Sequence, residues 1–220
     1  IEIKEELEKY ERESGKKAAP FGVNLIVHLT NPRVQPDLEI CIKHKVPIII
    51  TSLGAVSDLV KAVHSYGGIV YHDIIKKRHA EKAAEANVDG LILVAAGAGG
   101  HAGIINPIAL VNEIKKFFNK TILLAGSISN GNDVAAAIQM GADLAWMGTR
   151  FINVEESLAD EKYKKNPKKA AIIANEITTL YLEKRLSSRI LKSEKALSYL
   201  SEKLSFAKSE MDDANRAVEV

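Results

Sequence analysis

Six short, continuously apolar runs alternate with stretches of helix-forming residues, and this alternation limits the fold more than any other feature. The runs lie at 21–27, 47–53, 68–73, 90–96, 121–125 and 144–147. The helical stretches lie at 35–44, 56–65, 78–86, 107–118 and 133–140, after a charged amphipathic stretch at 2–16. Parallel strands that are buried on both faces read as continuous apolar runs, and alternation with helices places them in one sheet. The sequence therefore predicts an α/β fold with a parallel sheet or barrel, although six strands are too few to close an eight-stranded barrel.

A glycine-rich loop follows the fourth apolar run, where residues 97–103 read GAGGHAG. Glycine lets a neighbouring backbone or a flat ligand approach closely. His101 is the one functional side chain in this loop, and imidazole exchanges protons near neutral pH. The pattern fits a site of proton chemistry, but it also fits a tight strand-to-helix turn with a solvent-facing histidine, because a glycine-rich loop alone is a weak signal.

Two further glycine-containing loops follow the fifth and sixth runs. Gly126 and Ser127 come directly after the fifth run, and Gly148 and Thr149 directly after the sixth. In a (β/α) barrel, the loops after the last two strands commonly bind a phosphate through backbone N–H groups. The spacing therefore favours a phosphate site. The alternative is a pair of ordinary turns in which Ser or Thr caps a helix.

Charge and cysteine content narrow the classes of partner. The 30 Lys and Arg against 28 Asp and Glu give a net charge of +2, which does not favour nucleic acid as a partner. The single Cys41 cannot form an internal disulfide and fits a reducing compartment, so we expect the cytoplasm.

No apolar run approaches the roughly 18 residues that span a bilayer. The histidines and the cysteine do not have the spacing of a metal site, so no metal is expected.

The chain changes character after about residue 156, because glycine is absent beyond Gly148 and helix formers predominate. Apolar residues then recur at alternating spacings of three and four, at Leu197, Leu200, Leu204, Ala207, Met211, Ala214 and Val218. This spacing is typical of a coiled-coil seam, although a plain amphipathic helix packed on the barrel shows a similar pattern. We therefore expect two domains, an α/β domain at 1–156 and an all-α tail at 157–220. The tail is also the candidate surface for a homo-oligomer.

Residues 18–165 resemble the nitronate monooxygenase family, formerly called 2-nitropropane dioxygenases. The matching stretches, in the family's order, lie at 20–24, 44–53, 65–68, 72–73, 95–103, 126–129 and 141–151. The family consists of FMN-dependent (β/α) barrels. Its first two βα units have no counterpart in this sequence, which resembles an N-terminally truncated member. The resemblance therefore implies an incomplete TIM-type barrel of about six parallel strands that binds FMN.

The resemblance also implies roles for individual residues around the flavin ring. His101 looks like the family's catalytic histidine, which takes a proton from a neutral nitroalkane or holds the anionic nitronate. Gly99 and Gly100 would let the backbone pass beside the isoalloxazine ring. Asn24, which we expect at the end of the first strand, looks like a position that hydrogen-bonds the ring.

The same resemblance assigns the FMN phosphate to Gly126, Ser127, Gly148 and Thr149. His72 and Asp73 are expected to end the third strand and to face the same side. His72 has two equally good interpretations. It could have a role in the site, or it could form a structural hydrogen bond to Asp73.

Residues 166–220 show a second resemblance, to a helical segment of polysaccharide chain-length determinant (co-polymerase) proteins. It depends on residues 166–177, on 181–184 and on 196–204. This likeness is shorter and less specific than the first. It implies that the chain joins two pieces from proteins of different compartments.

Three functions follow from these observations. The first is FMN-dependent oxidation of alkyl nitronates by O₂, with a small molecule and O₂ as partners. The second is FMN-dependent reduction of an enoyl thioester, because the related enoyl-acyl-carrier-protein reductases share the Gly-Gly-His element. The third is a non-catalytic chimeric fragment with a self-associating helical tail.

Overall fold

The sheet of the protein consists of six parallel strands. The computed structural model describes residues 2–28, 30–54, 57–99 and 103–159. The strands are β1 (Gly22–Ile26), β2 (Ile48–Ser52), β3 (Ile69–Ile74), β4 (Gly90–Val94), β5 (Thr121–Ala125) and β6 (Leu144–Trp146), and they pair in chain order. Each coincides with one of the apolar runs, so the predicted α/β class and parallel sheet are confirmed.

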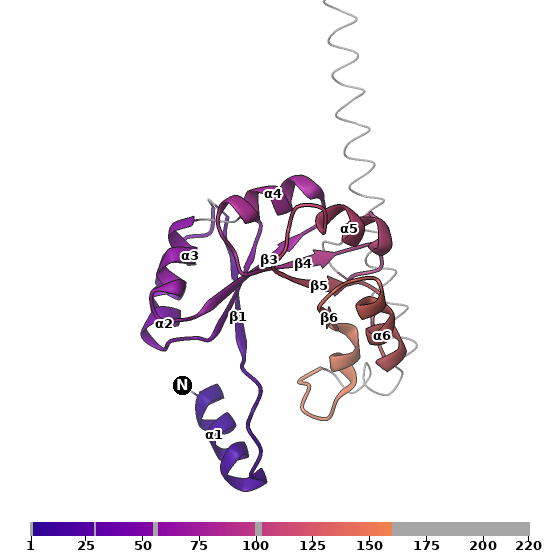
Figure 1. The fold of residues 1–220 in the computed structure, drawn as a ribbon. Coiled ribbons are helices and arrows are strands. Elements are labelled where there is room, and N and C mark those ends of the chain that lie inside the picture. The colour runs from indigo at the N-terminus through magenta and orange to yellow at the C-terminus, as the bar shows by residue number, and fades with distance from the viewer. Residues whose placement is uncertain (1, 29, 55–56, 100–102, 160–220) are drawn as a thin grey trace, which may run out of the picture. The chain divides into compact units, whose positions relative to one another are not determined.

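One helix precedes the first strand, and each strand is then followed by one helix. They are α1 (Glu2–Ser14), α2 (Val34–Lys43), α3 (Ser57–His64), α4 (Lys77–Glu85), α5 (Pro107–Ile114), α6 (Gly131–Gln139) and the 3₁₀ helix η1 (Thr149–Asn153). Figure 1 shows α2 to α6 around the outside of the curved sheet. Helix α5 is shorter than predicted, because the N–H groups of Phe117 and Phe118 both turn back to the carbonyl of Ile114.

The two faces of the sheet bury different cores. Strand register places alternate residues on the same face, so that Ile49 lies beside Val70, and Leu91 beside Ile122. This outer face packs against the helices and forms the main core, to which α3 contributes Val60 and Val63. The inner face carries a smaller cluster, with Ile92, Leu123 and Ala125 at its centre, packed against Ile50, Tyr71 and Val94.

The inner face is open at both edges of the sheet. Among the described residues β1 pairs with β2 and β6 with β5, and the two edge strands do not pair with each other. Inner-face side chains on these strands are correspondingly exposed, with 43% of Ile26, 47% of Leu144 and 40% of Trp146 accessible. The barrel is therefore incomplete, as the six apolar runs predicted.

The predicted helical tail lies outside the described residues except for its first positions. The boundary near residue 156 and the coiled-coil seam therefore stay predictions. Within the described part of the chain, every helix is too short or too polar to cross a membrane.

Candidate active site at the carboxyl ends of the strands

The loops after β4 and β5 are tied to each other by a backbone contact. The N–H of Ser127 donates to the carbonyl of Gly97 at 3.0 Å, and the Ser127 hydroxyl lies 3.4 Å from the same oxygen. A side chain on Gly97 would place its Cβ 2.1 Å from Ser127 Oγ, and one on Gly126 would approach the Ala96 carbonyl to 2.9 Å. Both glycines also have positive φ angles, of 91° and 133°. Packing between the two loops therefore requires glycine at both positions.

Two other glycines of the candidate site meet open space instead. A Cβ added to Gly99 or Gly148 would find no atom of the described residues within 4 Å, and both glycines are exposed. Neither has a positive φ angle, so backbone conformation does not require glycine there either. These two positions leave room beside the backbone for a group that is not part of the protein.

The loops after β5 and β6 come together as the candidate phosphate site requires. Ala125 lies beside Trp146 in the sheet, so the two loops leave neighbouring strands within two residues of this pair. The Ser127 N–H donates to the Gly97 carbonyl, and the exposed Ser127 hydroxyl makes a longer contact of 3.4 Å with the same oxygen, so the hydroxyl can reach a phosphate only by turning away from Gly97. In the described part of the chain, no side chain caps the turn that begins at Thr149 after Gly148.

Helix α6 contributes little to an anion site, although it starts close to Ser127. The Asn130 side chain accepts from the N–H groups of Asn132 and Asp133. The Asp133 carboxylate in turn accepts from the N–H groups of Ser129 and Asn130, at 2.8 and 3.2 Å. This capping box occupies the donors of the first turn and places a negative charge there, which disfavours a phosphate.

A second polar group lies on the inner face, at the ends of β1 to β3. The hydroxyl of Ser52 lies 2.8 Å from Asp73 Oδ2 and 3.1 Å from Asn24 Oδ1. Asn24 is the central residue of β1 rather than its last one, which corrects the predicted position. Ser52 was not predicted as a site residue. The signal was present, because Thr51 and Ser52 are the polar end of an apolar strand.

His72 does not share a face with Asp73, contrary to the prediction. Successive strand residues point to opposite faces, and His72 lies buried on the helix side of the sheet. Its Nδ1 forms a hydrogen bond of 2.8 Å with Thr51 Oγ1, so its partner is Thr51 and not Asp73. Burial lowers the pKa of His72, and the nearby Asp73 charge offsets part of this effect. His72 is thus a structural histidine outside the site.

The central residues of the glycine-rich loop, Gly100 and His101, lie outside the described residues. The loop returns to β4 immediately afterwards, since the Gly103 N–H donates to the carbonyl of Val94 at 3.1 Å. A Cβ on Gly103 would approach the same carbonyl to 2.5 Å. Both described flanks of the loop, Gly99 and Gly103, therefore belong to the carboxyl end of β4.

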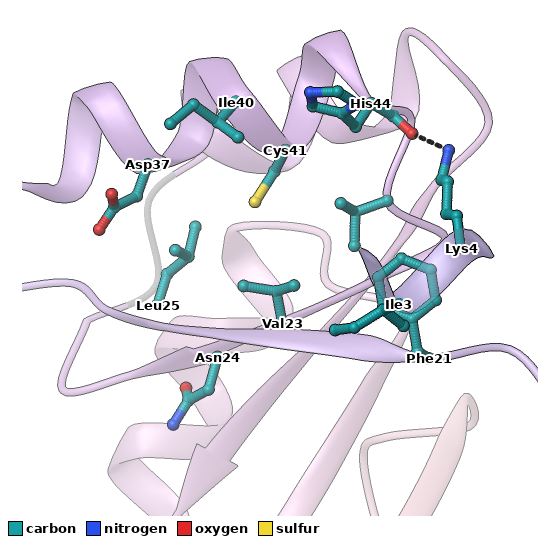
Figure 2. A pocket seen from close by; sticks show the side chains of 11 residues that line it. Ile3, Lys4, Phe21, Val23, Asn24, Leu25, Asp37, Ile40, Cys41 and His44 are labelled. Carbon is teal, nitrogen blue, oxygen red and sulfur yellow. Dashed lines mark hydrogen bonds between the residues drawn. The ribbon is translucent and has the colours of Figure 1, made fainter. Parts of the chain in front are cut away.

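A cavity of about 270 Å³ lies elsewhere, between α1, β1 and α2. Figure 2 shows Val23 and Cys41 facing it, whereas the Asn24 side chain leaves β1 on the opposite side. The Lys4 ammonium donates to the carbonyl of His44 at its rim. The lining is mostly apolar and holds none of the glycine loops, although it includes Asn24 of the candidate site.

Comparison with known proteins finds a family match over most of the chain. The model of the nitronate monooxygenase family matches residues 2–210, a wider range than the residues 18–165 that carry the resemblance. A nitronate monooxygenase from Paraburkholderia phytofirmans is 27% identical over 138 residues, which are 58% of this chain and 38% of that protein. The resemblance of residues 166–220 to co-polymerase proteins stays a prediction.

Two solved structures share the fold. FabK from Thermotoga maritima is 31% identical, with a TM-score of 0.61 over 73% of this chain and 51% of that one. Nitroalkane oxidase from Streptomyces ansochromogenes is 20% identical, with a TM-score of 0.62 over 72% of this chain and 58% of that one. The chain spans less than half the length of the curated relatives that it matches. Since the family match covers most of the sequence, this chain belongs to the nitronate monooxygenase family.

Proposed function

We propose that this chain forms the FMN site of a flavin-dependent oxidoreductase that oxidises alkyl nitronates with O₂. The observation that carries the proposal is the family match over residues 2–210, on a sheet whose loops after β4, β5 and β6 meet at one end. FMN would supply the redox chemistry, and the protein would bind and orient the two reactants. The domain boundary near residue 156 is part of the same proposal, with the flavin site entirely on its N-terminal side.

The phosphate of FMN would be held by the loops after β5 and β6. The Ser127 hydroxyl, the backbone around Gly126, and the uncapped turn at Gly148 and Thr149 supply the donors. The open space beside Gly148 fits this assignment, because a phosphate there would lie against backbone and not against a side chain.

The flavin ring would lie against the inner face of β1 and the carboxyl end of β4. Gly99, with open space beside it, and Gly100 would let the ring approach the backbone, and Asn24 would hydrogen-bond its edge. His101 would take the proton from the carbon of a neutral nitroalkane or hold the charge of a nitronate. These side chains bind and orient the substrate, whereas the electrons pass through the cofactor.

A titration of the purified full chain with FMN tests the proposal. Trp146 is the only tryptophan of the sequence and lies on the inner face of β6, so quenching of its fluorescence should follow saturable binding. Absence of binding would contradict the proposal and favour a non-catalytic fragment.

Two matched glycine variants locate the site. Gly131 lies at the start of α6, and an added Cβ there, as at Gly148, would meet nothing within 4 Å in the described part of the chain. The fold should therefore tolerate Gly148→Val and Gly131→Val equally, but only Gly148→Val should weaken FMN binding. Equal affinities of the two variants would place the phosphate elsewhere.

Reduction of an enoyl thioester is the second candidate, since the Gly-Gly-His element resembles that of enoyl-acyl-carrier-protein reductases. Stoichiometric NAD(P)H oxidation on adding an enoyl thioester, with no turnover of nitronates, would favour it. O₂ consumption with alkyl nitronates and no requirement for NAD(P)H would favour the first candidate.

A further inference from the structure

Ser52 lies between two side chains that both present oxygen to it. Its Oγ is 2.8 Å from Asp73 Oδ2 and 3.1 Å from Asn24 Oδ1, and Ser52 itself is buried. A hydroxyl carries a single proton, so it can donate to only one of these oxygens. The other contact must have a different donor, because two unprotonated oxygens at this distance repel each other.

The donor can be assigned from the chemistry of the three groups. A carboxylate only accepts hydrogen bonds, and hydrogen bonds to a charged acceptor are the stronger and shorter ones. The shorter contact, to Asp73, therefore takes the Ser52 proton. The Ser52 oxygen is then left as an acceptor, and the one donor that Asn24 offers is its amide nitrogen. The oxygen and nitrogen ends of an asparagine amide have the same shape, so the hydrogen bonds decide its orientation.

We propose that Asp73 and Ser52 form a relay that holds Asn24 with its amide nitrogen toward Ser52 and its carbonyl oxygen toward the open inner face. Asp73 and Ser52 are positioning residues in this relay, and Asn24 is the group that meets the ligand. Asn24 is exposed, so its free oxygen is accessible from the inner face. The identity of the ligand rests on the proposed function, whereas the relay itself does not.

The orientation of Asn24 determines which edge of a flavin it can recognise. Apart from its ribityl chain, an oxidised isoalloxazine ring has one hydrogen-bond donor, the N3–H group, and several acceptors. In the proposed orientation Asn24 presents its carbonyl oxygen to the inner face, and the one ring group that can donate to this oxygen is the N3–H group. An Asn24 of the opposite orientation would present N–H donors and would pair with ring oxygen or nitrogen atoms.

The first experiment needs no flavin. In NMR spectra of the ¹⁵N-labelled full chain, one pair of side-chain amide signals should disappear in Asn24→Asp. This loss assigns the pair to Asn24. The relay predicts that one proton of this pair exchanges slowly with solvent, and that Ser52→Ala removes the protection. An Asn24 amide that exchanges equally fast in both proteins would overturn the relay.

The second experiment compares FMN with an analogue that is methylated at N3. The unmodified protein should bind the analogue about tenfold more weakly, which is the usual effect of one lost hydrogen bond to a partly buried group. In Ser52→Ala the preference for FMN over the methylated analogue should become smaller, because the Asn24 side chain is then free to turn. An unchanged preference in Ser52→Ala would overturn the link between the relay and the flavin.

Two variants separate positioning from a general loss of structure. Thr51 is the neighbouring residue on the opposite face of β2, and its hydroxyl is also buried, against His72. Thr51→Val should lower stability without changing the preference between the two flavins, whereas Ser52→Thr retains the hydroxyl and should restore the preference. Slow amide exchange together with a failure to bind any flavin would contradict the proposed function and leave the relay intact.

Discussion

The backbone N–H of Ser127 donates to the carbonyl of Gly97 at 3.0 Å, and this contact joins the loops after β4 and β5. Ser127 adopts a positive φ of 54° to make it, a conformation that is unusual for a residue with a side chain. Such backbone strain is typically retained where the surrounding structure requires it, often at functional sites. The candidate catalytic loop and the candidate phosphate loop are therefore not independent of each other.

Replacing Gly97 should disturb both loops. In Gly97→Ala the new Cβ would lie 2.1 Å from Ser127 Oγ, on a residue with a φ of 91°. We expect a loss of about 1–3 kcal/mol in the free energy of unfolding, measured in urea, and weaker FMN binding. Gly99→Ala, for which nothing lies within 4 Å, is the control and should unfold like the unmodified protein. Equal stability of the two variants would mean that the loop contact does not constrain Gly97.

Stability should fall in mild acid because of His72. Burial lowers its pKa below the usual value near 6.5, so the unfolded chain binds a proton at higher pH than the folded one does. The free energy of unfolding should thus decrease as the pH falls below about 6.5, by at most about 1.4 kcal/mol per pH unit for this one group. His72→Gln should flatten the dependence measured by urea unfolding between neutral pH and the folded-state pKa of His72.

His79 provides the comparison for that experiment. Partial burial, followed by the charges of Lys76 and Lys82, also lowers the pKa of His79, but this residue is less buried than His72. We expect His79→Gln to flatten the pH dependence less than His72→Gln. An unchanged slope in His72→Gln would show that His72 is not the responsible group.

Asp89 should stabilise the amino end of the sheet. Its Oδ2 accepts from the backbone N–H of Val70 at 2.7 Å and contacts His64 Nε2 at 2.8 Å. Asp89→Ala would leave the N–H of a buried strand residue without a partner, at a cost of about 1–3 kcal/mol in the free energy of unfolding. Asp58, which forms an exposed ion pair with Lys61, is the matched control, and Asp58→Ala should have little effect. Similar losses in both variants would contradict the assignment.

His101→Ala tests the proposed base. Turnover of neutral nitroalkanes should fall by about 10²–10⁴-fold, because their proton must be removed, while FMN binding stays nearly intact. Turnover of preformed nitronate should suffer less, since it has already lost that proton. Equal losses with the two substrates, measured by O₂ consumption, would assign His101 a different role.

The sequence by itself determined the elements and their class. Continuous apolar runs predicted all six strands, because strands covered on both faces exclude polar residues along most of their length. The glycine motifs were also visible in the sequence, as was their position directly after the strands.

Only the tertiary structure decided what each of those residues contacts. The pleat separates His72 from Asp73, and the strand register brings Ser52 between Asn24 and Asp73, residues that are 28 and 21 positions away. Likewise, Gly97 and Gly126 are required by the contact between two loops, whereas Gly99 and Gly148 face open space. Such distinctions depend on pairings between distant segments, and the local pattern of a sequence does not encode them.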